Sequence, residues 1–112
     1  MDCLFCMIAE KKIPSKPVYE DELIYAFYDI KPQAPVHVLV IPKTHIPSAA
    51  AITPENSGVV AHIFEVIPKI AKTLGLSGGF RIISNCGQDA KQSVEHLHFH
   101  IIGGKELAVD MG

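Results

Sequence analysis

Apolar residues fall into short runs along the chain, separated by proline, glycine and polar turns. Runs of this length that are rich in β-branched and aromatic residues are typical of β-strands. The pattern predicts strands over residues 18–20, 23–30, 37–41 and 80–85. The run 37–41 is mostly apolar and stops at Pro42, which indicates a buried strand.

Two other segments have the spacing of helices. A short helix is predicted over residues 3–10, and a long helix is predicted to begin near Thr53, a residue suited to an N-cap, with Pro54 at the first position. The stripe on the long helix consists of apolar residues three or four positions apart: Val59, Ile63, Val66, Ile67, Ile70 and Leu74. Because this stripe continues past Pro68, we expect a kink there, and Gly75 is the expected end of the helix.

The segment 96–102 alternates strictly between histidine and apolar residues at its start. On a strand, successive side chains point to opposite faces. The segment therefore places His96, His98 and His100 on one face, and Leu97, Phe99 and Ile101 on the other, where they can pack on a core. The polar loop 86–92 precedes it.

The predicted order is a short helix, three strands, a long helix and two strands. Strands and helices are partly segregated in this order, which favours an α+β fold with a five-stranded, mainly antiparallel sheet. A length of 112 residues fits a single domain, residues 1–112. Residues 3–10 and the long helix are then the two helices of that domain.

Composition and charge narrow the classes of function. A hydrophobic content of 48% excludes a disordered chain, and a net charge of −2 without a basic stripe argues against a nucleic-acid partner. No apolar run reaches the roughly 18 residues that span a bilayer, so no membrane partner is expected. The N-terminus lacks the features of a signal peptide, so a cytoplasmic location is expected and the three cysteines are not expected to form a disulfide framework.

Three histidines alternating on one strand face have three explanations. They can be structural, but burying three imidazoles together without a function costs free energy of desolvation. They can bind a metal ion, since alternating histidines chelate zinc, but Glu95 has the opposite parity and no carboxylate shares their face. They can act on a phosphate substrate, because a neutral imidazole is a nucleophile at neutral pH.

The sequence His96-Leu97-His98-Phe99-His100-Ile101-Ile102 resembles the His-x-His-x-His-x-x signature of the histidine-triad superfamily. The surrounding sequence is similar to the branch of histidine-triad nucleotide-binding proteins, over nearly the whole chain. The similar stretches are Cys3-Leu4-Phe5-Cys6, Ile13-Pro14-Ser15, residues 29–35, His37, Ile41-Pro42-Lys43-Thr44-His45, Gln92-Ser93-Val94 and Gly103-Gly104. The resemblance implies a homodimer whose sheet continues across the interface, and hydrolase or transferase chemistry at the α-phosphate of a nucleotide.

The resemblance also assigns roles to residues. His98 is the implied nucleophile, which would form a nucleotidyl-histidine intermediate, and His37 and His100 would hold the phosphate oxygens. Ser93 would assist the leaving group, and its presence favours a purine nucleoside phosphoramidase over a dinucleoside polyphosphate hydrolase, which more often carries glutamine there. The other implied nucleotide contacts are Phe27 and Ile30 at the base, Asp29 at the ribose hydroxyls, and Asn85 and Gln92 near the phosphate.

Cys3 and Cys6 have the spacing of half a tetrahedral zinc site. In many bacterial relatives two histidines complete such a site, and these correspond to His45 and His96. The alternative is a pair of cysteines one turn apart on an apolar helix. No Walker-type glycine loop or acidic magnesium cluster is present, so no magnesium requirement is expected.

Two features depart from the family pattern. Lys91 replaces the glycine that usually precedes the Gln-Ser pair, and a positive φ at this position would strain a lysine. The tail after Lys105 lacks the tryptophan-proline element of many relatives. The alternatives to a phosphoramidase are a dinucleoside polyphosphate hydrolase or nucleotidyl transferase, a nucleotide-binding scaffold without catalysis, and a small zinc-binding structural protein.

Overall fold

The computed structural model describes residues 3–110, so both ends of the predicted domain, 1–2 and 111–112, lie outside the described residues. The elements follow the predicted order, with one additional 3₁₀ turn. They are α1 (Leu4–Ala9), β1 (Pro17–Glu20), β2 (Ile24–Tyr28), β3 (Val36–Pro42), η1 (Ala49–Ala51), α2 (Ser57–Thr73), β4 (Phe80–Ile83) and β5 (Phe99–Gly103). The predicted α+β class is confirmed.

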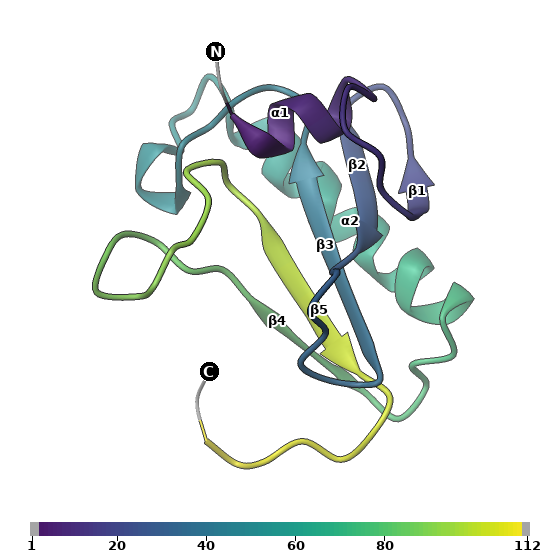
Figure 1. Ribbon diagram of the computed structural model, residues 1–112. Helices are drawn as coiled ribbons and strands as arrows, with labels where there is room; N and C mark the ends of the chain where they lie inside the picture. The colour runs from purple at the N-terminus through teal and green to yellow at the C-terminus, as the bar shows by residue number, and fades with distance from the viewer. Residues whose placement is uncertain (1–2, 111–112) are drawn as a thin grey trace.

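The five strands form one sheet in the order β1-β2-β3-β5-β4, and every neighbouring pair is antiparallel. Two hydrophobic clusters lie on its two faces. The larger cluster joins α2 to one face through residues such as Ile67, Val38 and Ile101. The smaller cluster joins α1 to the other face through Phe5, Phe27 and Leu39. The two helices thus cover opposite faces of the sheet, with α1 over one end (Figure 1).

Strand register places the functional residues on the α1 face. Leu39 pairs with His100 and His37 pairs with Ile102, so these side chains share one face of the sheet. Phe27 pairs with Leu39 and belongs to the same face. The apolar residues Leu97, Phe99 and Ile101 pack on the opposite side with α2, as the alternation predicts.

The predicted start of the long helix is wrong. α2 begins at Ser57, with Asn56 as N-cap, rather than near Thr53. The side chain of Asn56 accepts a hydrogen bond from the backbone N–H of Thr53 at 2.7 Å, and the carbonyl of Thr53 accepts the N–H of Ser57 at 2.9 Å, so residues 53–56 form a turn that leads into α2. The residue types at 53–56 suit the first turn of a helix, so the sequence could not show that the regular helix begins only at Ser57.

The predicted continuation of the long helix past Pro68 and its predicted end at Gly75 are confirmed. α2 continues through Pro68 and ends at Thr73, after which Gly75 adopts a φ of +72°. The N–H of Leu76 bonds the carbonyl of Ala71 at 2.9 Å, which closes the helix end around that glycine. No helix among residues 3–110 is long and apolar enough to cross a membrane.

The turn before β2 is fixed to α2 by Asp21. Its carboxylate accepts hydrogen bonds from the backbone of Leu23 and Ile24, the hydroxyl of Tyr19 and the Nε2 atom of His62, the last at 2.6 Å. Burial alone would raise the pKa of Asp21, but these hydrogen bonds outweigh it and hold the pKa well below its ordinary value.

A carboxylate with a depressed pKa stabilises the fold above its unfolded pKa of about 4, and this stability is lost as the pH falls through the folded pKa. We therefore expect Asp21→Asn to lower the free energy of unfolding by about 1 kcal/mol at pH 7. Urea unfolding at pH 7 and pH 3 measures the effect, and the difference between variant and wild type should shrink at pH 3. An equal difference at both pH values would contradict the assignment.

Candidate active site and metal centre

The catalytic loop, defined as residues 84–98, runs from the end of β4 to the start of β5. The predicted strand over 96–102 is wrong at its beginning, because β5 starts only at Phe99. The N–H of His96 bonds the carbonyl of Val94 at 2.9 Å, and the N–H of Leu97 bonds the carbonyl of Ile46 at 2.6 Å. These bonds hold His96 and His98 before the strand, with both side chains buried.

His98 has a fixed tautomer. Its Nδ1 atom lies 2.6 Å from the carbonyl oxygen of His96, so Nδ1–H donates to that oxygen. The lone pair is therefore on Nε2. Burial lowers the pKa of His98, and the ring is neutral at pH 7. A neutral imidazole with a free Nε2 lone pair, in the wall of a cavity, is suited to act as a nucleophile.

His37 and His100 form a directed pair beside it. The N–H of Gln33 donates to Nδ1 of His37 at 3.0 Å, which places the proton of His37 on Nε2. That Nε2 lies 2.9 Å from Nδ1 of His100 and donates to it, so His100 carries its own proton on Nε2. Burial and the neighbouring rings of His98 and His37 lower the pKa of His100 to about 4. His100 is thus a neutral hydrogen-bond donor beside His98.

Asp29 lies next to this pair. One carboxylate oxygen accepts the N–H of Lys31 at 2.8 Å, and the other lies 3.5 Å from Nε2 of His37. Asp29, His37 and His100 are close enough to hold a metal ion. The backbone N–H of Gln33 argues against a metal ion at this place. A metal ion on Nε2 of His37 would require the ring proton to be on Nδ1, where it would face the N–H of Gln33. The arrangement is better suited to a chain of hydrogen bonds.

The imidazole cavity, of about 270 Å³, is the space in front of His98 and His100. Of the residues predicted as nucleotide contacts, Ser93, Asp29, Phe27 and Ile30 line it together with the two histidines. Phe5, Ile8, Ile13 and Leu39 line it as well, and sequence analysis did not assign them to the site. An adjoining outer cavity, of about 800 Å³, lies beyond Asp29 and Ile30 and also includes His37 and Lys16.

Phe5 is the most important residue that sequence analysis missed. Its ring meets the rings of His98 and Phe27 edge-on, with centroids 5.0 and 5.7 Å away. The sequence did contain a sign of its role, because Phe5 lies between Cys3 and Cys6 in a segment that resembles the family. Its apolar character alone is equally typical of a core residue.

The structure places Asn85 and Gln92 outside the lining of the imidazole cavity. The amide of Asn85 donates to the carbonyl of Ala90 at 2.8 Å. Gln92 accepts the N–H of Gly87 and donates to the carbonyls of Pro47 and Val94. Both side chains fix the shape of the catalytic loop, and Gln92 connects it to the segment that follows His45.

Lys91 has a φ of +63° in the same loop. The strain expected for a lysine at this position is therefore present.

We expect Lys91→Gly to raise the free energy of unfolding by roughly 0.5 kcal/mol. Glycine relieves the backbone strain of the folded state, but part of this gain is lost because glycine gives the unfolded chain more conformational entropy. Lys91→Ala is the matched control, since it removes the charge but keeps the strain. Thermal unfolding of both variants measures the effect. Equal stability of the two would mean that the backbone conformation at Lys91 carries no strain.

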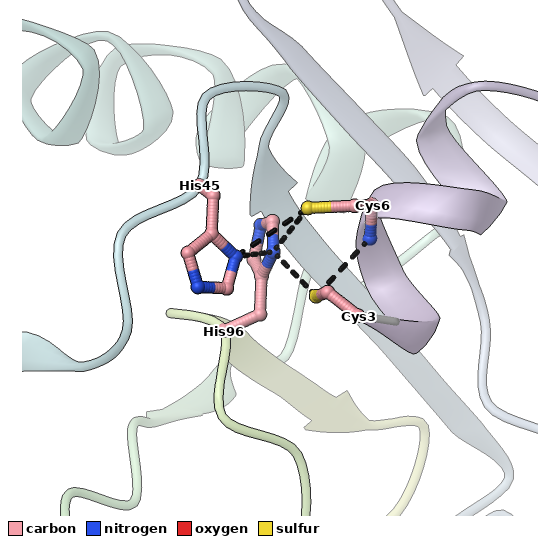
Figure 2. Close-up of side chains that lie close together, drawn as sticks. All are labelled: Cys3, Cys6, His45 and His96. Atoms are coloured by element: carbon pink, nitrogen blue, oxygen red, sulfur yellow. Dashed lines mark hydrogen bonds between the residues drawn. The ribbon is translucent and has the colours of Figure 1, made fainter. Parts of the chain in front are cut away.

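Four side chains meet between α1, the loop after β3 and the catalytic loop (Figure 2). Sγ of Cys3 lies 3.2 Å from Nδ1 of His96, and Sγ of Cys6 lies 3.4 Å from Nδ1 of His45 and 3.5 Å from that of His96. The two Nδ1 atoms are 3.2 Å apart. This Cys/His cluster joins the four residues that the resemblance implies, and they are close enough to hold a metal ion.

The donors of the cluster fit a tetrahedral zinc ion. Ligand bonds of about 2.0–2.3 Å at tetrahedral angles require ligand atoms about 3.3–3.8 Å apart, close to the distances observed. Nε2 of His96 lies 2.9 Å from the carbonyl oxygen of Pro42 and donates to it, so the lone pair of Nδ1 points into the cluster. A backbone acceptor of this kind is typical for a metal-binding histidine.

Comparisons with known proteins agree with this geometry. The HIT domain family matches residues 10–107. The chain is 45% identical over 102 residues to Protein HitA of Neisseria gonorrhoeae, covering 91% of this chain and 95% of that protein.

Two solved structures superpose closely. A histidine triad protein from Clostridium difficile has a TM-score of 0.95 and 50% identity, covering 99% of this chain and 97% of that one. A HIT family hydrolase from Legionella pneumophila has a TM-score of 0.95 and 40% identity, covering 99% of this chain and 100% of that one. With the three histidines placed as described, the chain belongs to the HIT domain family.

Proposed function

We propose that this protein hydrolyses purine nucleoside 5′-phosphoramidates and related AMP conjugates at the α-phosphate. The observation that carries the proposal is the tautomer of His98: its Nδ1–H donates to the carbonyl of His96, and Nε2 has no hydrogen-bond partner among residues 3–110. The name of the L. pneumophila neighbour, a hydrolase, agrees with hydrolytic chemistry. The resemblance to nucleotide-binding proteins supplies the substrate class.

The proposed reaction proceeds in two displacements. Nε2 of His98 attacks the α-phosphorus, the bond from phosphorus to the leaving nitrogen breaks, and its electron pair leaves with the amine. Ser93, which lines the cavity, passes a proton to this amine. Water then attacks phosphorus and gives a proton to Ser93, which restores its hydroxyl, and AMP leaves as the bond to His98 breaks and its electron pair returns to Nε2.

The other side chains position the substrate. Nε2–H of His100 donates to a phosphate oxygen, and its direction is fixed by His37 and Gln33. Because this N–H is oriented before the reaction begins, it can stabilise the negative charge that develops on the phosphate oxygens in the transition state. Asp29 accepts hydrogen bonds from the ribose hydroxyls, and the apolar wall formed by Phe5, Phe27 and Ile13 holds the base.

We further propose that the Cys/His cluster binds one structural zinc ion, with no open position for catalysis. Bound zinc would fix α1 to the catalytic loop. This matters for the active site, because Phe5 on α1 contacts the ring of His98, and His96 provides the acceptor for that ring. A homodimer, a cytoplasmic location and independence from magnesium are also part of the proposal.

The test is hydrolysis of adenosine 5′-phosphoramidate in magnesium-free buffer, followed by chromatography of released AMP. The same assay with diadenosine tetraphosphate tests the alternative polyphosphate activity. Faster release from the phosphoramidate supports the proposal. AMP binding without hydrolysis of either compound would instead indicate a nucleotide-binding scaffold.

A further inference from the structure

A buried hydroxyl lies behind the apolar wall of the imidazole cavity. Tyr25 is 1% exposed, and its ring stacks on Phe27 with centroids 5.6 Å apart. Its hydroxyl lies 2.7 Å from Oγ of Ser15. Among residues 3–110, Ser15 is the hydrogen-bond partner that the structure gives to this hydroxyl. Ser15 lies in the loop between α1 and β1.

The direction of this hydrogen bond follows from burial. If Ser15 donated to Tyr25, the proton of the buried phenol would have no acceptor, at a cost of about 1–3 kcal/mol. Ser15 is only half-buried and lines both cavities, so its own proton can reach water or a ligand. Tyr25 therefore donates to Ser15, and the hydroxyl proton of Ser15 is free for another acceptor.

The position of Ser15 in the cavity identifies that acceptor. The inference rests on the proposed function, in which His98, His100 and Ser93 serve the phosphate and Asp29 serves the ribose. Most of the remaining wall is apolar, and among residues 3–110 only Ser15 and Tyr28 add polar side chains to it. Tyr28 is 39% exposed and pairs with Val38, whose side chain packs on the α2 face. Ser15 is thus the polar group with a fixed direction close to Ile13, in the part of the wall that the proposed function assigns to the base.

We propose that the Ser15 hydroxyl, oriented by Tyr25, donates a hydrogen bond to a ring acceptor of the bound purine base. Ser15 is then a residue that determines base specificity, and Tyr25 is a positioning residue behind it. The ring nitrogens N1, N3 and N7 of adenine are the available acceptors. A neutral hydrogen bond contributes about 0.5–1.5 kcal/mol, which corresponds to a change of roughly 2- to 12-fold in Kd.

The experiment is calorimetric titration of the full chain with AMP and with its 1-deaza, 3-deaza and 7-deaza analogues. We expect one of the three analogues to bind wild type several-fold more weakly than AMP. Ser15→Ala should weaken AMP by the same factor and leave that one analogue unaffected. Tyr25→Phe should weaken AMP less, and the double variant should bind like Ser15→Ala. Ser77→Ala, at an exposed turn, is the matched control.

Unchanged AMP affinity in Ser15→Ala would overturn the inference, as would equal binding of AMP and all three analogues to wild type. The analogue series uses wild type alone, so it remains decisive if a variant fails to fold. Failure of AMP to bind wild type and Ser77→Ala would contradict the proposed function itself. AMP binding that does not depend on Ser15 would contradict only the base contact.

Discussion

His98→Ala is expected to lower the rate of phosphoramidate hydrolysis by about 10³-fold or more, because the variant lacks the atom that bonds to phosphorus. Binding of AMP should persist within several-fold, since Asp29, His100 and the apolar wall remain. Steady-state kinetics and calorimetry measure the two quantities.

A matched control for this substitution is His62→Ala. His62 lies on α2, on the opposite side of the sheet, and bonds Asp21. This variant should lose some stability but keep its turnover per folded molecule. Turnover in His98→Ala close to that of wild type would exclude His98 as the nucleophile.

Removal of metal from the Cys/His cluster is expected to have the largest effect on stability. An ion bound at about a thousand times its Kd stabilises the native state by about 4 kcal/mol. In a domain of this size this corresponds to roughly 15 °C in Tm. Thermal unfolding before and after dialysis against a chelator measures the loss, together with zinc content by atomic emission.

The cysteine variants separate the metal from other effects of the chelator. Cys6→Ser should have a low Tm that the chelator does not change further. Cys86→Ser is the matched control, because Cys86 lies outside the cluster, and it should respond to the chelator like wild type. A protein purified without a histidine tag that contains no zinc and keeps its Tm would contradict the zinc proposal.

The metal should also affect the active site. α1 has only six residues, which are too few to form a stable helix by themselves. Without zinc, α1 should therefore loosen, and Phe5 should lose its position beside His98. Zinc removal should therefore weaken AMP binding as well as lower the Tm.

The alternation of residues 96–101 predicted the two faces of this segment, because side-chain direction in an extended chain depends only on parity. It could not predict that β5 begins at Phe99. That boundary depends on the bonds from His96 to Val94 and from Leu97 to Ile46, and Ile46 lies far away in sequence. The start of α2 is a similar case: the N–H of Thr53 donates to the side chain of Asn56 and its carbonyl accepts the N–H of Ser57, so a turn precedes the regular helix.

The candidate site shows a similar division. Spacing joined Cys3 to Cys6, and the resemblance added His45 and His96, which no spacing rule could have supplied. It could not show how the amides of Asn85 and Gln92 are used, since an amide can bond a phosphate or a backbone carbonyl equally well. The tautomers of His98, His37 and His100 depend on three-dimensional contacts and could come only from the structure.

The most direct test of whether His98 bonds to phosphorus is the mass of the protein during a single turnover. The protein is mixed with adenosine 5′-phosphoramidate and quenched rapidly without acid. We expect a transient adduct of one adenylyl group, which fragmentation maps to His98 and which is absent from His98→Ala. Hydrolysis at full rate with no adduct at any time, or with the adduct on another residue, would contradict it.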